Sequence, residues 1–188
     1  MMRAPKCSFK GDASGFSHYF IMIQVGILSD THGYYDERFA HYFAECGLIL
    51  HAGDIGSIVL AERLNEIAPL KAVYGNIDGQ DIRSCYPEYL SCTIEGVSVL
   101  MMHIGGYPGH YSAKGRELIE KLKPDLFISG HSHILKVQYD KRYNLLHINP
   151  GAAGLSGWQT VRTLIRLEFD HSTMRNLEVV ELHTPGKS

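Results

Sequence analysis

The sequence predicts an α/β fold, a four-layer α/β/β/α sandwich in which two mixed sheets face each other and helices cover their outer sides. In the first half, short apolar runs alternate with segments of helical spacing. This β-α-β-α-β order is typical of a parallel sheet with crossover helices. In the second half, apolar runs of strand length follow one another between turn-rich segments, which indicates a mostly antiparallel arrangement.

The first half supplies three strands and two helices. The segment 36–46 has helical spacing and places aromatic side chains on one face. Ser57 is a suitable N-cap for a second helix, which ends at Ile67 before Pro69. The apolar runs read as buried parallel strands. These predicted strands are residues 23–29, 48–51 and 70–74.

The second half opens with a predicted hairpin, because Glu95-Gly96 separates two apolar runs at 90–94 and 97–103. Residues 113–122 are amphipathic and are followed by Pro124, which predicts a helix. The remaining predicted strands are residues 126–129, 134–139, 145–148, 163–169 and 177–182.

Length and composition indicate one domain. The chain has 188 residues, of which 45% are hydrophobic and 20% charged, the balance of a globular protein. The formal net charge of −2 implies no broad basic face, so nucleic acid is not an expected partner. The four cysteines form no C-x-x-C pair, which favours free thiols and a cytoplasmic location. No apolar stretch approaches the roughly 20 residues that span a bilayer.

The domain is expected to begin at Met22. Residues 1–21 are predicted to be an N-terminal extension that need not be ordered, and residues 22–188 form the domain. An apolar run behind three basic residues near the start resembles a signal peptide. Cleavage there would cut into the strand that carries the first motif, so we favour an extension.

Ligand-type side chains follow the predicted strands at the point where each strand ends. Loops at the carboxyl ends of strands are where open α/β sheets build their sites, so these side chains are expected to converge. His32 and His133 each lie two residues beyond one of them and can project to the same side. The residues at the strand ends are Asp30, Asp54, Asn76, His103 and His131.

These residue types suit a metal centre. Carboxylate, carboxamide and imidazole ligands without a thiolate favour Mn²⁺, Fe or Zn²⁺ in a reactive site over a structural zinc site. Each motif alone is common in turns. The whole series, with every member placed after a strand, favours a metal site.

The motifs also resemble those of a known family. From Met22 onwards the chain resembles the compact bacterial and archaeal phosphodiesterase group of the calcineurin-like metallophosphoesterase superfamily. The matching stretches are "ILSDTHG", "ILHAGDIG", "VYGNIDG", "LMMHIGG", "ISGHSHI" and "INPGAAG". The resemblance implies two divalent metal ions, with Mn²⁺ expected first and Fe, Zn²⁺ or Ni²⁺ as alternatives.

The resemblance also implies the ligand sets. One metal is expected on Asp30, His32 and His133, with Asp54 bridging to the second metal. The ligands expected on the second metal are Asn76, His103 and His131.

The implied activity is hydrolysis of a small or nucleotide-like phosphoester, a phosphodiester in preference to a monoester. A hydroxide held between the two metals is the expected nucleophile. Asn76 and His103 are the predicted substrate-binding residues, and Asp78 is a candidate for orienting ligands from behind.

One position departs from the superfamily pattern. Many members have histidine directly after the asparagine, where it is thought to protonate the leaving group, but this chain has Ile77. His110, in the loop after His103, is the candidate that could replace this general acid. The alternative is that His110 is merely an exposed loop residue.

Other histidines and one late motif have structural interpretations. His51 could support Asp54 or be a buried, hydrogen-bonded residue, and His147 is expected to pack inside a strand. Asn149-Pro150-Gly151 is expected to shape the backbone near the metals.

Two other functions stay open at this point. Ile77 leaves room for a weak or inactive phosphoesterase-like scaffold that binds proteins, as the retromer subunit of this fold does. A DNA-repair nuclease is disfavoured because the chain lacks the capping segments and the histidine of those enzymes. Edge strands and exposed aromatic residues leave a homodimer open.

Overall fold

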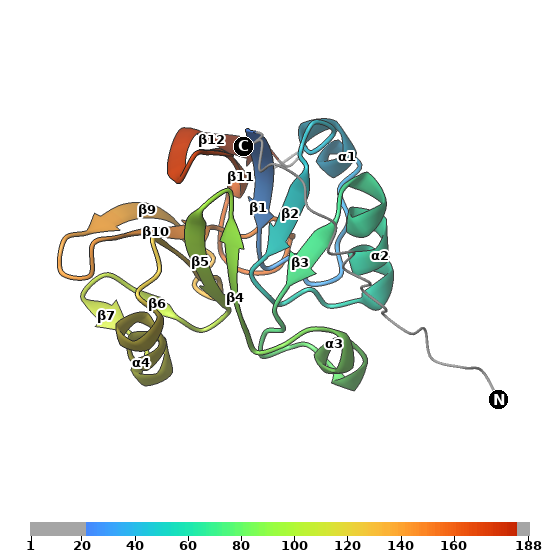
Figure 1. Ribbon diagram of the computed structural model, residues 1–188. Coiled ribbons are helices and arrows are strands. Elements are labelled where there is room, and N and C mark those ends of the chain that lie inside the picture. Colours follow the sequence, from blue (N-terminus) through green and yellow to red (C-terminus); the bar gives the residue numbers. More distant parts are fainter. Residues whose placement is uncertain (1–21, 184–188) are drawn as a thin grey trace.

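The computed structural model describes residues 22–183 (Figure 1). The predicted extension 1–21 lies outside the described residues. Twelve strands and four helices follow in chain order. They are β1 (Ile23–Leu28), α1 (Arg38–Tyr42), β2 (Leu48–His51), α2 (Ile58–Ile67), β3 (Leu70–Ala72), α3 (Gln80–Cys85), β4 (Tyr89–Ile94), β5 (Val97–Met102), β6 (Gly106–Tyr107), β7 (His110–Tyr111), α4 (Ala113–Leu122), β8 (Leu126–Ile128), β9 (Leu135–Asp140), β10 (Leu145–Pro150), β11 (Arg162–Asp170) and β12 (Thr173–Leu182).

The strands form two five-stranded sheets. The first has the order β12-β11-β1-β2-β3, with β1, β2 and β3 parallel, β11 antiparallel to β1, and β12 antiparallel to β11. The second has the order β4-β5-β8-β10-β9. Its centre, β5-β8-β10, is parallel, and only its two edge strands are antiparallel. The prediction of two mixed sheets is confirmed. The expectation of a mostly antiparallel second half misses this centre, where α4 returns the chain between β5 and β8.

Three apolar clusters hold the layers together. One fills the space between the sheets with side chains such as Val25 and Ile27 of β1 and Val99 and Met101 of β5. A second cluster joins the outer face of the first sheet to α1, α2 and Ile82 of α3, and a third joins the second sheet to α4. This is the predicted order of layers, and Figure 1 shows the helices on the two outer sides.

The helix boundaries follow from their caps. The Ser57 side chain accepts the backbone N–H of Leu60, as its role as N-cap predicts, and Ser112 does the same for α4. The predicted helix 36–46 is wrong in length, because α1 is confined to Arg38–Tyr42. The Asp36 carboxylate accepts the N–H of Arg38, and the backbone turns out of helical geometry at Phe43.

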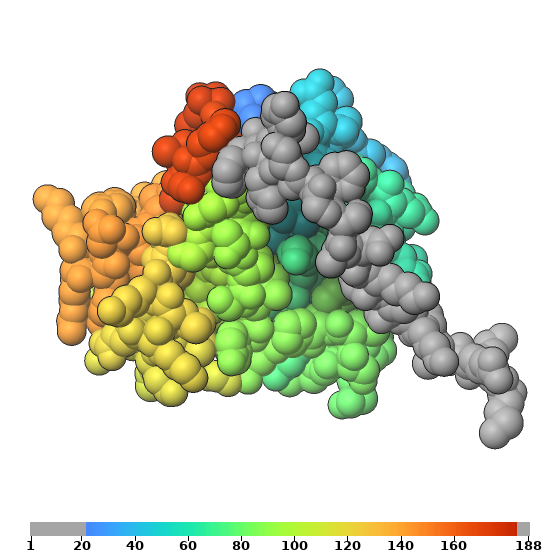
Figure 2. All heavy atoms as spheres, in the orientation of Figure 1, coloured from blue at the N-terminus to red at the C-terminus, as the bar shows by residue number. Residues whose placement is uncertain are grey.

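Neither α3 nor the small β6–β7 hairpin was predicted, because both are too short to produce a periodic pattern in the sequence. The hairpin lies next to α4 and below the β9–β10 arm, which extends from the side of the molecule in Figures 1 and 2. No helix within residues 22–183 is long and apolar enough to cross a membrane.

The parallel strands of both sheets end at one common edge. There the loops that follow them are joined by backbone hydrogen bonds. Asp30 N–H donates to Gly53 O, and Gly130 N–H donates to His103 O, each at 3.0 Å. Gly154 N–H, from the loop after β10, reaches Asp30 O at 3.1 Å. The loops that carry the predicted ligands are therefore hydrogen-bonded to one another along this edge.

Candidate metal centre

All the predicted ligands lie at this edge, in two adjacent groups. Within each group one ligand atom per residue lies within 4.8 Å of the others. The groups are Asp30 with His32 and His133, and Asp54 with His103 and His131. This is the division that the family resemblance implies.

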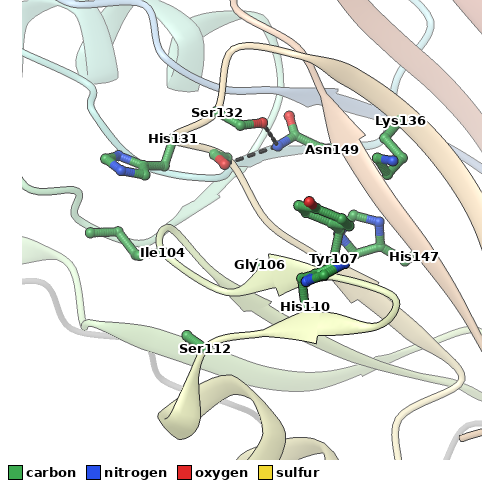
Figure 3. Close-up of a pocket in the computed structure, with 11 residues that line it drawn as sticks. Ile104, Gly106, Tyr107, His110, Ser112, His131, Ser132, Lys136, His147 and Asn149 are labelled. Carbon is green, nitrogen blue, oxygen red and sulfur yellow. Dashed lines mark hydrogen bonds between the residues drawn. The ribbon is translucent and has the colours of Figure 1, made fainter.

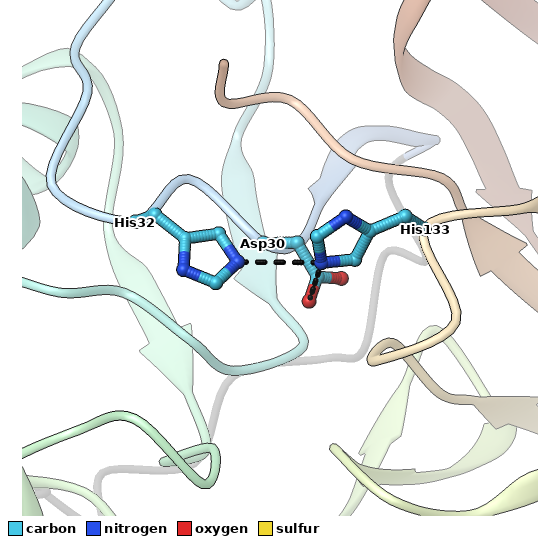
Figure 4. A group of neighbouring side chains, drawn as sticks. All are labelled: Asp30, His32 and His133. Atoms are coloured by element: carbon cyan, nitrogen blue, oxygen red, sulfur yellow. Dashed lines mark hydrogen bonds and ion pairs between the residues drawn. The ribbon is translucent and has the colours of Figure 1, made fainter. Parts of the chain in front are cut away.

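The first group converges on imidazole nitrogens and one carboxylate (Figure 4). His32 Nε2 lies 3.3 Å from His133 Nε2, which is itself 3.2 Å from Asp30 Oδ1. Asp30 is fully buried, and the two rings are partly exposed. Three potential ligand atoms from two loops thus meet in a space open on one side.

The second group includes Asn76. His103 Nε2 lies 3.2 Å from Asn76 Oδ1 and 3.3 Å from Asp54 Oδ1. The ring of His131 lies 5.3 Å from that of His103, measured between centroids. His103 is buried, whereas Asn76 and His131 are exposed. The exposed members give the group an open side.

Asp54 faces both groups. Its Oδ2 lies 3.8 Å from His32 Nε2 in the first group, and its Oδ1 lies 3.3 Å from His103 Nε2 in the second. A carboxylate in this position can offer one oxygen to each of two cations.

The residues fit bound cations. Asp30 Oδ1 is buried, and although His133 Nε2 lies 3.2 Å away, this oxygen accepts no hydrogen bond within the described chain. A buried carboxylate oxygen normally requires one. A cation between Asp30 and the neighbouring imidazoles would satisfy it. The donors are oxygen and imidazole nitrogen, a set that suits Mn²⁺, Fe and Zn²⁺.

The local field favours positive charge. Burial alone would lower the pKa of His103, but the hydrogen bond to Asp54 and the charges of Asp30 and Asp54 outweigh it and raise that pKa. Asp30 likewise raises the pKa of His133. Burial opposes ionisation of Asp54, yet His103 holds the pKa of that carboxyl below its usual value. The same field that attracts protons attracts metal cations.

Two histidine rings are oriented by hydrogen bonds of their Nδ1 atoms to oxygens outside the two groups. His103 Nδ1 lies 2.8 Å from Ala52 O, which can only accept, so Nδ1 carries the proton and Nε2 presents a lone pair to the site. His133 Nδ1 lies 3.2 Å from Gln159 Oε1. The Gln159 amide donates to Ser156 O at 2.6 Å, which turns its oxygen towards the ring. Both rings therefore leave Nε2 available to a metal ion.

His51 braces the loops that hold the ligands. Its Nδ1 accepts the N–H of Gly53, so Nε2–H donates to Thr31 Oγ1 at 2.9 Å, and Thr31 in turn donates to Ile55 O. Burial lowers the pKa of His51 to about 4, which keeps the ring neutral in this chain of hydrogen bonds. His51 is therefore both a buried, hydrogen-bonded residue and a support of the Asp54 loop, the two interpretations that the sequence left open.

Asp78 is a second brace. It is buried, and its carboxylate accepts the backbone N–H groups of Gly75, Ile55 and Gly56 at 2.7, 3.2 and 2.8 Å. These contacts join the Asn76 loop to the Asp54 loop, in agreement with the supporting position expected of Asp78.

The ligand loops adopt a backbone that side chains rarely tolerate. Five of the seven predicted ligands have positive φ, between 48° and 68°. Such conformations cluster at functional sites, where the surrounding structure holds them. The five are Asp30, His32, Asp54, His131 and His133.

The residues outside the two groups occupy different places. His110 is exposed on β7, and its ring contacts Tyr107 with centroids 5.0 Å apart. It lines the same hollow as His131 but belongs to neither group. Asn149 Nδ2 donates to Gly130 O and Ser132 Oγ, so it shapes the loop of His131 and His133 as expected. His147 is fully buried inside β10, also as expected.

Gln159 is a supporting residue that the sequence did not reveal. It lies in a loop without periodic pattern, far along the chain from His133, so no local spacing could indicate the contact. Its role becomes visible only when the loop is folded against the metal centre.

Comparison with known proteins agrees with this geometry. The family model of the calcineurin-like phosphoesterase superfamily domain matches residues 23–172. A probable metallophosphoesterase of Methanothermobacter thermautotrophicus is 31% identical over 68% of this chain and 76% of its own length. One of Methanocaldococcus jannaschii is 28% identical over 76% of this chain and 80% of its own length.

A solved structure shares the fold. The Zn²⁺ complex of wild-type Vps29 from Entamoeba histolytica superimposes with a TM-score of 0.66 and 18% identity, over 85% of this chain and 99% of that one. Family model, archaeal relative and fold together show that the chain belongs to the calcineurin-like phosphoesterase superfamily.

Proposed function

We propose that the protein is a binuclear metal-dependent phosphoesterase that hydrolyses phosphodiesters in preference to monoesters. The position of Asp54 supports this most directly, since each of its carboxylate oxygens faces one of two separate ligand groups. Two cations held in this way activate a water for attack on phosphorus and neutralise the charge that develops on the phosphoryl oxygens. Mn²⁺ is the expected metal.

The chain's own side chains orient the substrate. Asn76 is exposed beside His103. Its amide Nδ2 is free to donate to a phosphoryl oxygen while its Oδ1 faces the site. Buried Asp30 and Asp54 fix the position of positive charge, so an anionic ester lies at the open side of the two groups. The substrate is a small or nucleotide-like phosphoester.

The test is hydrolysis of bis(4-nitrophenyl) phosphate by the Mn²⁺-treated chain, compared with the Asp54→Asn variant. We expect the variant to lose at least about 10³-fold in kcat, because a neutral amide cannot bridge two cations with both oxygens. Asp81→Asn, an exposed carboxylate on α3, should leave kcat unchanged. Full activity of Asp54→Asn, or no hydrolysis by the unmodified chain, would contradict the proposal.

His110 remains the proposed proton donor for the leaving group. It is exposed, and it lines the hollow that His131 borders. His110→Ala should lose the basic limb of the pH–rate profile for an ester with a poor leaving group, but not for a nitrophenyl ester. An unchanged profile with both esters would remove His110 from the mechanism.

A protein-binding scaffold is the second candidate, and one observation favours it. Trp158 is fully exposed, and with Ile134 it lines a hollow of about 560 Å³ that His133 also borders. Apolar side chains in such a position suit a protein partner. Hydrolysis separates the two functions, since a scaffold needs the surface but not the metal-dependent turnover. A cytoplasmic location and a homodimer stay predictions.

A further inference from the structure

A second hollow of about 310 Å³ lies beside the candidate metal centre. It is bounded by the loop of residues 130–133, the β6–β7 hairpin and the strands β9 and β10. His131 borders it, so the pocket is continuous with the second ligand group. Side chains with nitrogen or aromatic groups gather on its other side in Figure 3. They are Tyr107, His110, Lys136 and His147.

The pocket has positive charge without a counter-charge. Lys136 is partly buried, and its ammonium lies 4.6 Å from the centroid of the Tyr107 ring. Within residues 22–183, no carboxylate lies within 4.0 Å of the Lys136 ammonium, and no aspartate or glutamate lines the pocket. The guanidinium of Arg83, in contrast, donates to the backbone oxygens of Asp78 and Gly75. Lys136 is therefore available to a ligand.

One residue of the pocket wall also has a buried polar atom without a hydrogen-bond partner. The Ser129 hydroxyl donates to Gly106 O and thus accepts from His147 Nε2–H, which leaves Nδ1 of His147 as an acceptor. This Nδ1 is buried and has no hydrogen-bond partner in the described chain. Buried polar atoms are normally satisfied, so this nitrogen suits a donor such as a water that accompanies a polar ligand, and recognition of negative charge falls to Lys136.

We propose that this pocket binds an anionic end group on one ester arm of the substrate, and that Lys136 determines this specificity. The inference rests on the proposed phosphoesterase function, which places the phosphoryl group at the metals. A volume of about 310 Å³ is at the lower end of the range for small-molecule sites, roughly 300–1,000 Å³. The arm is therefore short and ends in a carboxylate or phosphate, which Lys136 binds by a charge-assisted hydrogen bond.

Two monoesters of nearly equal shape test the pocket without requiring turnover. Propyl phosphate and 2-carboxyethyl phosphate differ only in the methyl or carboxylate at the end of the arm. Calorimetric titration of the Mn²⁺-treated chain should give about tenfold tighter binding of the carboxylate, which corresponds to about 1.4 kcal/mol. Lys136→Gln should abolish this preference and leave the affinity for propyl phosphate unchanged, and Lys136→Arg should restore part of it.

The matched control is Lys141→Gln, an exposed lysine in the turn after β9, which should keep the full preference. Equal affinities of the unmodified chain for the two monoesters, binding of neither, or a preference that survives in Lys136→Gln would overturn the inference. Failure to hydrolyse a phosphodiester while the Lys136-dependent preference persists would overturn the proposed catalytic function instead.

Discussion

At the scale of single residues, the candidate site depends on groups that orient its histidine rings through Nδ1. His103 and His133 each use Nδ1 for a supporting oxygen and keep Nε2 for the site. The two supports differ in kind. Ala52 O belongs to the backbone and survives most substitutions, whereas Gln159 is a side chain that can be removed.

Removal of Gln159 should therefore weaken metal binding. We expect Gln159→Ala to lower the affinity for Mn²⁺ about 10- to 100-fold, because His133 loses the contact that fixes its tautomer and ring angle. Isothermal titration with Mn²⁺ measures this. Gln138→Ala, on the exposed side of β9, is the control and should bind Mn²⁺ normally. Equal affinities of the two variants would refute the supporting role.

His147 makes stability depend on pH. Burial lowers the pKa of His147 to about 4 in the folded state, whereas its pKa in the unfolded chain is about 6.5. Between these two pH values only the unfolded state gains a proton. The stability that neutral His147 contributes is complete above pH 6.5 and is lost as pH falls towards 4.

The unfolding free energy of the unmodified chain should thus fall relative to that of His147→Gln by up to about 1.4 kcal/mol per pH unit in this window. Urea denaturation at pH 7, 6 and 5 measures the difference between the two. An exposed histidine is the control, and His41→Gln should show no such trend. A constant difference for His147→Gln would show that the pKa of the ring is the same in the folded and unfolded states, and would contradict the prediction.

At the scale of elements, the sequence predicted the strands well and the connections poorly. Buried strands such as β2 are continuous apolar runs that need no partner to be recognised. The two-residue strands of the β6–β7 hairpin exist only because Gly106 and Gly109 adopt positive φ and the loop folds against α4. The pocket with Lys136 follows from that hairpin, so no sequence pattern could reveal it.

Glycine in the Asn76 loop permits the close approach of two elements. A Cβ at Gly75 would lie 2.0 Å from Asp54 Oδ1 and 2.4 Å from Asp54 N. Gly75→Ala should therefore displace Asp54 and reduce both metal affinity and thermal stability.

The matched substitution is Gly79→Ala in the same loop, where the nearest atom to the new Cβ is the end of the Asp81 side chain. Elemental analysis and melting temperatures of the two variants compare them. We expect metal loss and a lower Tm in Gly75→Ala only. Normal metal content in Gly75→Ala would show that the contact between the loops is not needed for the site.

At the scale of the whole molecule, the ligands meet because both sheets direct the ends of their parallel strands to the same edge. The sequence predicted the sandwich and the convergence of the candidate ligand residues at one edge, since each of them follows a recognisable strand. It could not predict which side chains of the two sheets pack together or the positive φ angles of the ligand loops, because these depend on packing between distant segments. The buried pair of Asp36 and Arg162 is a further long-range contact of this kind.

The central claim, two cations bridged by Asp54, has one direct test. A crystal of the chain soaked in Mn²⁺ should show two anomalous scattering peaks about 3.5–4 Å apart, one beside each carboxylate oxygen of Asp54. The first peak should contact Asp30, and the second should contact His103. A single peak, or two peaks that do not share Asp54, would contradict the account.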